Sequence, residues 1–470
     1  MIADLLALLP PLFLILSGLG IILLSVLRKG LGLPWLLSSL AALVIWVLLL
    51  ALHWLSPSPV FFIGWNPLEP FVNLINFQLD LISWPYSFAL ATLTMAVLFT
   101  SAARIESTVA AIWGLDLIFG GLGILAAMAA SPITFALVWA LIDVGEFLVL
   151  YRTIGQRGQM RPLILSFAVQ ITSVFLVLLA MMVSRWKGLE LNFDQLPFQA
   201  GILLFFGAVL RLGVFPRSLP YPDDFRFKRD FGTLLRGIQP ATGLVLLARL
   251  PDVNMPATEL TLLKLFIAVA ALYGSLRWAA ADDEANMHPF WAIGTAGLAM
   301  LAVLNGYQIT SVIWGLILIL IGGVLGLYSS RDTRIQYIPL LAVLGILGLP
   351  FTPAAGGWLG LANQPFSLFT IFYFVIHLVL VVGLVRHLFK PGENYTNLDR
   401  WIRVIYPAGL LMLIITQWVV ATWGWPGSYT AGVWWASVIP SILLLAGYFV
   451  WTNAPLRERH QEQYLRWRYR

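Results

Sequence analysis

A succession of long apolar runs decides what this chain can fold into. A helix crosses the bilayer core with about 17–25 apolar residues. Because lipid offers no hydrogen-bond partners, each such run must satisfy its own backbone as a helix. The sequence therefore predicts an all-α, polytopic transmembrane helix bundle with about 14–15 spans. We expect spans near residues 3–26, 34–55, 81–102, 108–129, 132–151, 163–183, 199–216, 231–249, 258–278, 288–304, 308–328, 336–352, 365–387, 402–423 and 433–451.

The composition also indicates an integral membrane protein. Hydrophobic residues make up 60% of the chain and charged residues only 11%, whereas soluble proteins contain about 25% charged residues. The net charge of +6 comes from lysines and arginines in short loops between apolar runs. Such loops favour the cytoplasmic side, so their alternation predicts an outer N-terminus and a cytoplasmic C-terminus, in a prokaryotic inner membrane. This pattern predicts contact with the lipid bilayer and no nucleic-acid partner.

The stretch from Gly201 to Leu250 departs from simple spanning helices. It carries Arg211 and Arg236 inside two apolar runs. A cation at the bilayer centre costs about 2.5–3.5 kcal/mol on insertion scales, so it is retained where it faces a partner, water or packed protein. The first of these helices is broken close to the membrane, and broken helices need protein or a cavity around their unpaired carbonyls. The residues at this break are Pro216, Pro222 and Asp223.

This stretch resembles the antiporter-like membrane subunits of respiratory complex I, the proton-translocating NADH-quinone oxidoreductase, and of Mrp-type cation/proton antiporters. In that family a lysine is followed by proline five residues later and by Pro-Asp ending twelve residues later. Here Arg211 replaces the lysine, with Pro216, Pro222 and Asp223 at the family spacings. Arg236 stands where the next family helix has histidine. The chain is thus similar to a divergent member of this family.

Two further motifs support the resemblance. Phe77, Asp80 and Ser83 match the entry to the third family helix. In the second half, Gly348-Leu-Pro350-Phe-Thr-Pro353-Ala-Ala-Gly356 resembles the family sequence that breaks the twelfth helix. The resemblance implies two inverted five-helix repeats, each with a broken helix. The domains expected on this basis are N-terminal helices (1–107), a first repeat (108–250), a second repeat (251–390), and C-terminal helices with a basic tail (391–470).

Ionisable groups inside spans are the candidates for an ion path. The family glutamate that follows a tryptophan is replaced here by Ala140 after Trp139, but Asp143 lies about one helical turn further on and is expected to pair with Arg211. A pair of Asp143 with Arg211, or of Glu146 with Arg236, is either part of an ion path or a static link between helices. For Asp116 we favour a helix-to-helix hydrogen bond. The candidates in this half are Asp116, Asp143, Glu146, Arg211 and Arg236.

The second half offers fewer such groups. No lysine occurs between Lys264 and Lys390, and Trp358 or Gly360 stands where the family has its second lysine. Lys264 and His377 remain as candidates; Lys264 is expected to extend toward the surface, and His377 to pack with one hydrogen bond. These departures place conduction through this half in doubt.

Several chemistries lack support in the sequence. It contains no cysteine and only five scattered histidines, and it lacks phosphate-binding, zinc-protease and serine-nucleophile motifs. We therefore expect no catalytic residues, no metal site and no cofactor of its own, and enzyme activity is left open.

The resemblance implies a membrane-arm subunit of a multi-subunit redox or antiporter complex that translocates protons or sodium. Its partners would be the other membrane subunits of a hetero-oligomer. Two alternatives stay open. The first is a non-conducting structural subunit of such a complex. The second is a stand-alone secondary transporter whose arginines bind an anionic substrate.

Overall fold

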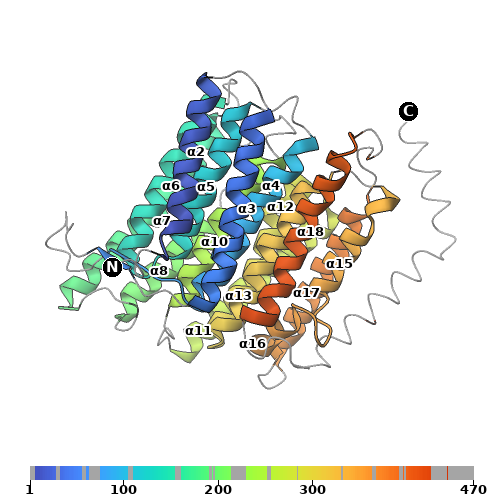
Figure 1. The fold of residues 1–470 in the computed structure, drawn as a ribbon. Helices are drawn as coiled ribbons and strands as arrows, with labels where there is room; N and C mark the ends of the chain where they lie inside the picture. Colours follow the sequence, from blue (N-terminus) through green and yellow to red (C-terminus); the bar gives the residue numbers. More distant parts are fainter. Residues whose placement is uncertain are drawn as a thin grey trace.

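The computed structural model is an all-α bundle of long helices lying side by side (Figure 1). Helices of the N-terminal half (residues 1–250) lie on the left of this view, and most helices of the C-terminal half (251–470) lie on the right. The structure describes residues 6–27, 32–55, 60–62, 75–103, 109–153, 160–189, 193, 196–212, 229–250, 256–282, 284–329, 332–362, 367–390, 395, 398–424 and 442.

The predicted spans correspond to helices wherever the chain is described. The span expected at 433–451, apart from residue 442, and the whole of the basic tail lie outside the described residues. In the N-terminal half the helices are α2 (Leu9–Leu27), α3 (Gly32–Leu55), α4 (Ser83–Ser101), α5 (Ala110–Ala127), α6 (Pro132–Thr153), α7 (Met160–Trp186), α8 (Phe198–Arg211) and α10 (Phe231–Arg249). In the C-terminal half they are α11 (Ala257–Ala280), α12 (Glu284–Leu304), α13 (Gln308–Leu316), α14 (Gly322–Leu327), α15 (Tyr337–Ile346), α16 (Leu359–Ala362), α17 (Leu368–Leu388) and α18 (Ile402–Val419).

Ten membrane-crossing segments among the described residues are long and apolar enough to span a bilayer. Their burial separates the outside of the bundle from its middle. Only 28% of the best spanning window of α11 is buried, so most of this helix faces outward, whereas the window of α10 is 100% buried. A helix surrounded by protein can carry polar side chains that lipid would exclude. The position of α10 therefore explains why Arg236 and Gln239 are tolerated there.

The segment between α3 and α4 adds a short β-hairpin that the all-α prediction did not include. Strands β1 (Val60–Phe62) and β2 (Ile75–Phe77) are antiparallel, with Phe61 opposite Asn76. Strand β2 also bonds the turn between α5 and α6, since the Gln78 N–H donates to the Met128 carbonyl over 2.8 Å. The hairpin thus fixes the start of α4 against the next two helices.

One of the two predicted helix breaks lies within the described residues. Helix α15 ends at Ile346, and the chain then turns through Gly348 and Phe351, whose φ angles of 71° and 63° are left-handed. This turn contains Pro350 and Pro353, and Gly356 lies in the 3₁₀ segment Ala355–Trp358 that leads into α16. The break predicted around Pro350, Pro353 and Gly356 is confirmed. Residues Pro216, Pro222 and Asp223 of the other break lie outside the described residues, although α8 does end at Arg211.

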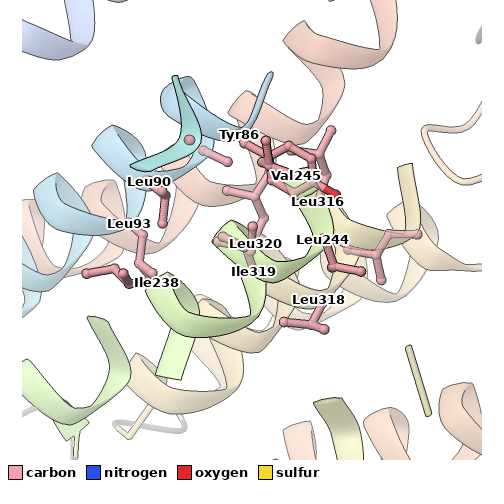
Figure 2. Close-up of a cluster of buried hydrophobic side chains, with 14 of the residues drawn as sticks. Tyr86, Leu90, Leu93, Ile238, Leu244, Val245, Leu316, Leu318, Ile319 and Leu320 are labelled. Atoms are coloured by element: carbon pink, nitrogen blue, oxygen red, sulfur yellow. The ribbon is translucent and has the colours of Figure 1, made fainter. Parts of the chain in front are cut away.

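An apolar layer lies in the middle of the bundle. A π-helical segment, η4 (Ile317–Ile321), joins α13 to α14 and packs against α4 and α10. Figure 2 shows the side chains that meet there, which form an apolar layer of leucine, isoleucine and valine that also includes Tyr86. This layer lies where helices from the two halves of the chain come together. Its labelled members are Tyr86, Leu90, Leu93, Ile238, Leu244, Val245, Leu316, Leu318, Ile319 and Leu320.

An ion pair fastens the entrance of α4 to the end of α10. The Arg249 Nη1 donates to Asp80 Oδ2 over 2.8 Å, while Asp80 Oδ1 accepts the N–H groups of Ile82 and Ser83. Burial favours the neutral carboxyl, but the Arg249 charge and the Ser83 hydrogen bonds outweigh burial and hold the pKa of Asp80 below its ordinary value of 3.8. This gives the spacing of Asp80 and Ser83 a physical explanation: the aspartate organises the start of a helix.

The depressed pKa of Asp80 predicts an acid-sensitive contribution to stability. A group whose pKa is lower in the folded state stabilises the fold above its unfolded pKa, and this stabilisation is lost as the pH falls through the folded pKa. We expect the wild-type chain to resist heat better than Asp80→Asn at neutral pH, and the difference to shrink as the pH falls below 3.8 and to vanish below the lower pKa of the folded state. Thermal unfolding in lipid nanodiscs measures this. Asp282→Asn, whose carboxylate is 99% exposed in its pair with Arg386, is the control with little effect; a difference that does not change with pH contradicts the assignment.

Candidate functional site

The candidate site is built on Arg211, the last residue of α8. Its side chain is only 1% exposed. Three nitrogens of the guanidinium have partners: Nε donates to Ser173 Oγ over 2.9 Å, Nη1 to Asp143 Oδ1 over 2.9 Å and Nη2 to Asp143 Oδ2 over 2.5 Å. A buried arginine is stable only with such a complete set of acceptors. The helix thus ends where the cation meets its partners.

Asp143 is the ionic partner of Arg211, as the sequence predicted. Its carboxylate is fully buried and accepts both terminal nitrogens of the guanidinium, in the bidentate geometry that makes arginine–carboxylate pairs strong. Trp139 lies one turn earlier on α6, and its ring stands 4.2 Å from Arg211 Cζ. A tryptophan face attracts a cation at this distance. Arg211 is therefore held by charge on one side and by an aromatic ring on another.

Gln239 of α10 joins this ion pair to a second carboxylate. Its Oε1 accepts Arg211 Nη1 over 2.5 Å, and its Nε2 donates to Glu146 Oε2 over 2.9 Å. Gln170 of α7 donates to the same Glu146 oxygen over 3.2 Å. Glu146 is 3% exposed. The amide of Gln239 is thus oriented by a donor on one side and an acceptor on the other. We call Asp143, Glu146, Gln170, Ser173, Arg211 and Gln239 the Arg211 cluster.

The two carboxylates of the Arg211 cluster have different neighbours. Asp143 bonds a guanidinium directly, whereas the partners of Glu146 among the described residues are the two amides of Gln170 and Gln239. Arginine stays protonated under all accessible conditions. Adding a proton to Glu146 therefore breaks no ion pair, while adding one to Asp143 does. Glu146 is the group in the cluster whose charge can change at least cost. The pairing of Glu146 with Arg236 that the sequence suggested is wrong.

The other candidates of the N-terminal half lie apart from the cluster. Arg236 is 5% exposed on α10, and its charge acts on His288 of α12, which is also 5% exposed. Asp116 of α5 is fully buried, and neither of its oxygens has a hydrogen-bond partner among the described residues. The helix-to-helix hydrogen bond expected for Asp116 is therefore wrong.

In the C-terminal half, aromatic rings occupy the region around His377. Its Nε2 lies 2.8 Å from the Ile346 carbonyl oxygen, and its ring centroid lies 5.6 Å from Trp314 and 5.2 Å from Trp358. The expectation that His377 packs with one hydrogen bond is confirmed. Trp358 is fully buried. Lys264 is half-buried on α11, without an acidic partner in the part of the chain that the structure describes.

Three members of the cluster were not among the residues predicted from sequence: Gln170, Ser173 and Gln239. A signal for them exists. Polar residues three positions apart recur in apolar helices, as Asp143 and Glu146 on α6, Gln170 and Ser173 on α7, and Arg236 and Gln239 on α10. Residues at this spacing share a helix face. Within the described residues, no group of histidine and acidic side chains could hold a metal ion.

The fold of this chain is shared with chains of known structure, although its sequence is not closely similar to theirs. No family model and no curated protein sequence matches the chain. Solved structures do match. A chain of the Mrp complex from Dietzia sp. DQ12-45-1b has 14% identity and a TM-score of 0.72, covering 97% of this chain and 57% of that one. A chain of respiratory complex I from Thermus thermophilus has 20% identity and a TM-score of 0.66, covering 93% of this chain and 99% of that one. The chain has the fold of an antiporter-like membrane subunit.

A third match comes from an archaeal respiratory membrane complex. A chain of the membrane-bound sulfane sulfur reductase has 16% identity and a TM-score of 0.64, covering 88% of this chain and 75% of that one. All three matches are chains of multi-subunit membrane complexes. The antiporter-like fold extends through almost all of this chain, which spans 57% of the length of the Mrp chain. The resemblance inferred from the Arg211 stretch is thus confirmed at the level of the fold.

Proposed function

We propose that this chain is a membrane-arm subunit of a multi-subunit redox or antiporter complex that translocates protons or sodium, and that its own ion-handling site is the Arg211 cluster. The proposal rests on one observation: a fully buried arginine–carboxylate network stands at the end of α8, inside an antiporter-like fold. Buried charges in a membrane protein are costly and are retained mainly at functional sites.

The cluster suggests how this site would work. Arg211 and Asp143 form a fixed pair of opposite charges, and Glu146 is the member that takes up or releases a proton. Gln239 contacts all three groups, with Nε2 lying 3.4 Å from Asp143 Oδ1 and 2.9 Å from Glu146 Oε2. A change of charge on Glu146 therefore alters the hydrogen bonds of Gln239 and the position of Arg211. Such a rearrangement is the local step that ion passage requires.

The second predicted repeat contributes little to this path. The tryptophans Trp314 and Trp358 pack around His377, and the apolar layer around Leu93 and Ile319 lies between the halves. We propose that ions handled by the first repeat (108–250) do not continue through the second (251–390). The orientation that accompanies this proposal has an outer N-terminus and a cytoplasmic C-terminus.

A non-conducting structural role is the second candidate. It is favoured by the Arg211 pair itself, since a buried arginine whose three nitrogens all donate hydrogen bonds also serves to tie α6, α7 and α8 together. The stand-alone transporter of an anion is less well supported, because the Arg211 charge is already neutralised by Asp143.

Co-purification tests the proposal. The full chain is solubilised in mild detergent with a C-terminal tag, and the proteins that come with it are identified by mass spectrometry. We expect other antiporter-like or redox membrane subunits in fixed stoichiometry. Reconstitution of that complex in vesicles, with dyes for pH and sodium, then measures ion translocation. A chain that purifies alone, as a monomer or a homo-oligomer, contradicts the proposal.

A further inference from the structure

Asp116 is a buried carboxyl group that the Arg211 cluster does not use. It lies on α5, its exposed fraction is 0%, and both side-chain oxygens lack a hydrogen-bond partner among the described residues. A carboxylate in such a position would be an unpaired charge inside a membrane protein, which is strongly unfavourable. The group is therefore most stable as a neutral acid, with its proton bound.

Among the described residues, the charge that acts on Asp116 belongs to another acid. Asp230, at the start of α10, is the group whose charge acts on Asp116, and it is itself an acid that is only 4% exposed. Helix α2 carries no titratable side chain, and in α4 the only one is Tyr86, which packs against Gly315 of α13. The remaining helices that contact α5 bring His53 from α3, Asp143, Glu146, Tyr151 and Arg152 from α6, and Arg236 and Arg249 from α10.

Two aromatic rings pack together close in the chain to Asp116 and Asp230. Phe119 lies one turn after Asp116 on α5, and Phe231 follows Asp230; their ring centroids are 5.3 Å apart at an interplanar angle of 79°. The Phe119 ring also borders Gly145, where an added Cβ would lie 3.2 Å from Cζ. Gly145 is the neighbour of Glu146. The Phe119 side chain thus links the helix that carries Asp116 to the stretch of α6 that carries Glu146.

We propose that Asp116 is a second proton-binding site, loaded from the end of the bundle where α10 begins and separated from Glu146 by the Phe119–Phe231 ring pair. The proton resides on one carboxyl oxygen, and its transfer leaves a carboxylate beside Asp230. A proton fits this site better than a metal cation, which needs several oxygen ligands; no group of three acidic or histidine side chains surrounds it within the described residues. This proposal rests on the proposed function and makes it more specific: the ion is a proton, and Asp116 is a site that binds it.

Infrared spectroscopy of the purified full chain in lipid tests this site. A protonated carboxylic acid has a carbonyl stretching band that a carboxylate lacks. In the difference between wild type and Asp116→Asn at neutral pH, we expect the complete loss of one such band, which shifts in D₂O. Asp80→Asn is the matched control and leaves all protonated-acid bands in place, because Asp80 lies outside the Arg211 cluster and is ionised in its pair with Arg249.

The outcomes of this experiment are distinct. Absence of a protonated-acid band from Asp116 overturns the proposal. If Asp116→Asn does not fold, Asp116→Glu retains the acid and is expected to move the band rather than remove it. Phe119→Ala should speed the exchange of the Asp116 proton for deuterium, whereas an unchanged rate argues against the ring pair as a barrier. The band is read from the chain itself, so it is independent of whether partner subunits co-purify or ions are translocated.

Discussion

Replacing Arg211 with alanine is expected to destabilise the protein by about 3–5 kcal/mol, because the substitution leaves the Asp143 carboxylate buried without its cation. The same change should abolish ion translocation by the reconstituted complex. Two losses from one substitution are ambiguous, since a misfolded subunit also fails to translocate. Stability is therefore measured by thermal unfolding, and translocation is normalised to the amount of assembled complex.

A double variant separates the two effects. Arg211→Met with Asp143→Leu removes both charges and replaces them with apolar groups, and such replacements of buried ion pairs are often neutral or stabilising. We expect this variant to assemble and to remain inactive. Arg386→Ala is the control. In its ion pair the Arg386 side chain is 43% exposed and the Asp282 side chain is 99% exposed, and exposed pairs contribute about 0–1 kcal/mol. Full translocation by the double variant would show that the pair is a static link.

The sequence was informative about Asp143 for a physical reason. The position of the family glutamate is lost at Ala140, and the helical period places Asp143 on nearly the same face one turn later, where it meets Arg211. Likewise, His377 stands alone in an apolar run, which predicts a packing role with a single partner, and the Ile346 carbonyl is that partner. Patterns within one helix were sufficient in both cases.

Features that depend on packing between helices were missed. The role of Gln239 follows from the meeting of α6, α8 and α10, and an uncharged amide gives no indication of which neighbours it will bridge. The same ignorance of packing produced the incorrect pairing of Glu146 with Arg236. The hydrogen bond for Asp116 was expected because a buried polar group usually has a partner. Neither oxygen of Asp116 has one among the described residues, and the charge that acts on it belongs to a second acid.

Replacing Trp358 with alanine is expected to lower stability and to leave ion translocation unchanged. Trp358 is fully buried, and its ring centroid lies 6.1 Å from Trp314, 5.1 Å from Phe374 and 5.2 Å from His377. Truncation of such a residue leaves a cavity and costs about 3–5 kcal/mol. If ions do not pass through the second repeat, translocation per assembled complex should stay at the wild-type level despite this loss of stability.

The comparison of Trp358→Ala with Arg211→Ala locates the ion path without knowledge of the ion. Both substitutions remove a fully buried, large side chain, from the end of α8 in one case and from the segment Ala355–Trp358 in the other, and should lower thermal stability by similar amounts. Trp186→Ala, at a side chain that is 92% exposed, controls for the removal of a tryptophan and should change neither property. Translocation that falls, or accelerates, in Trp358→Ala would mean that the tryptophan cluster lies on the path. Loss of translocation in Arg211→Ala alone would instead confine the path to the first repeat, so that an ion leaving this cluster must cross into a neighbouring subunit.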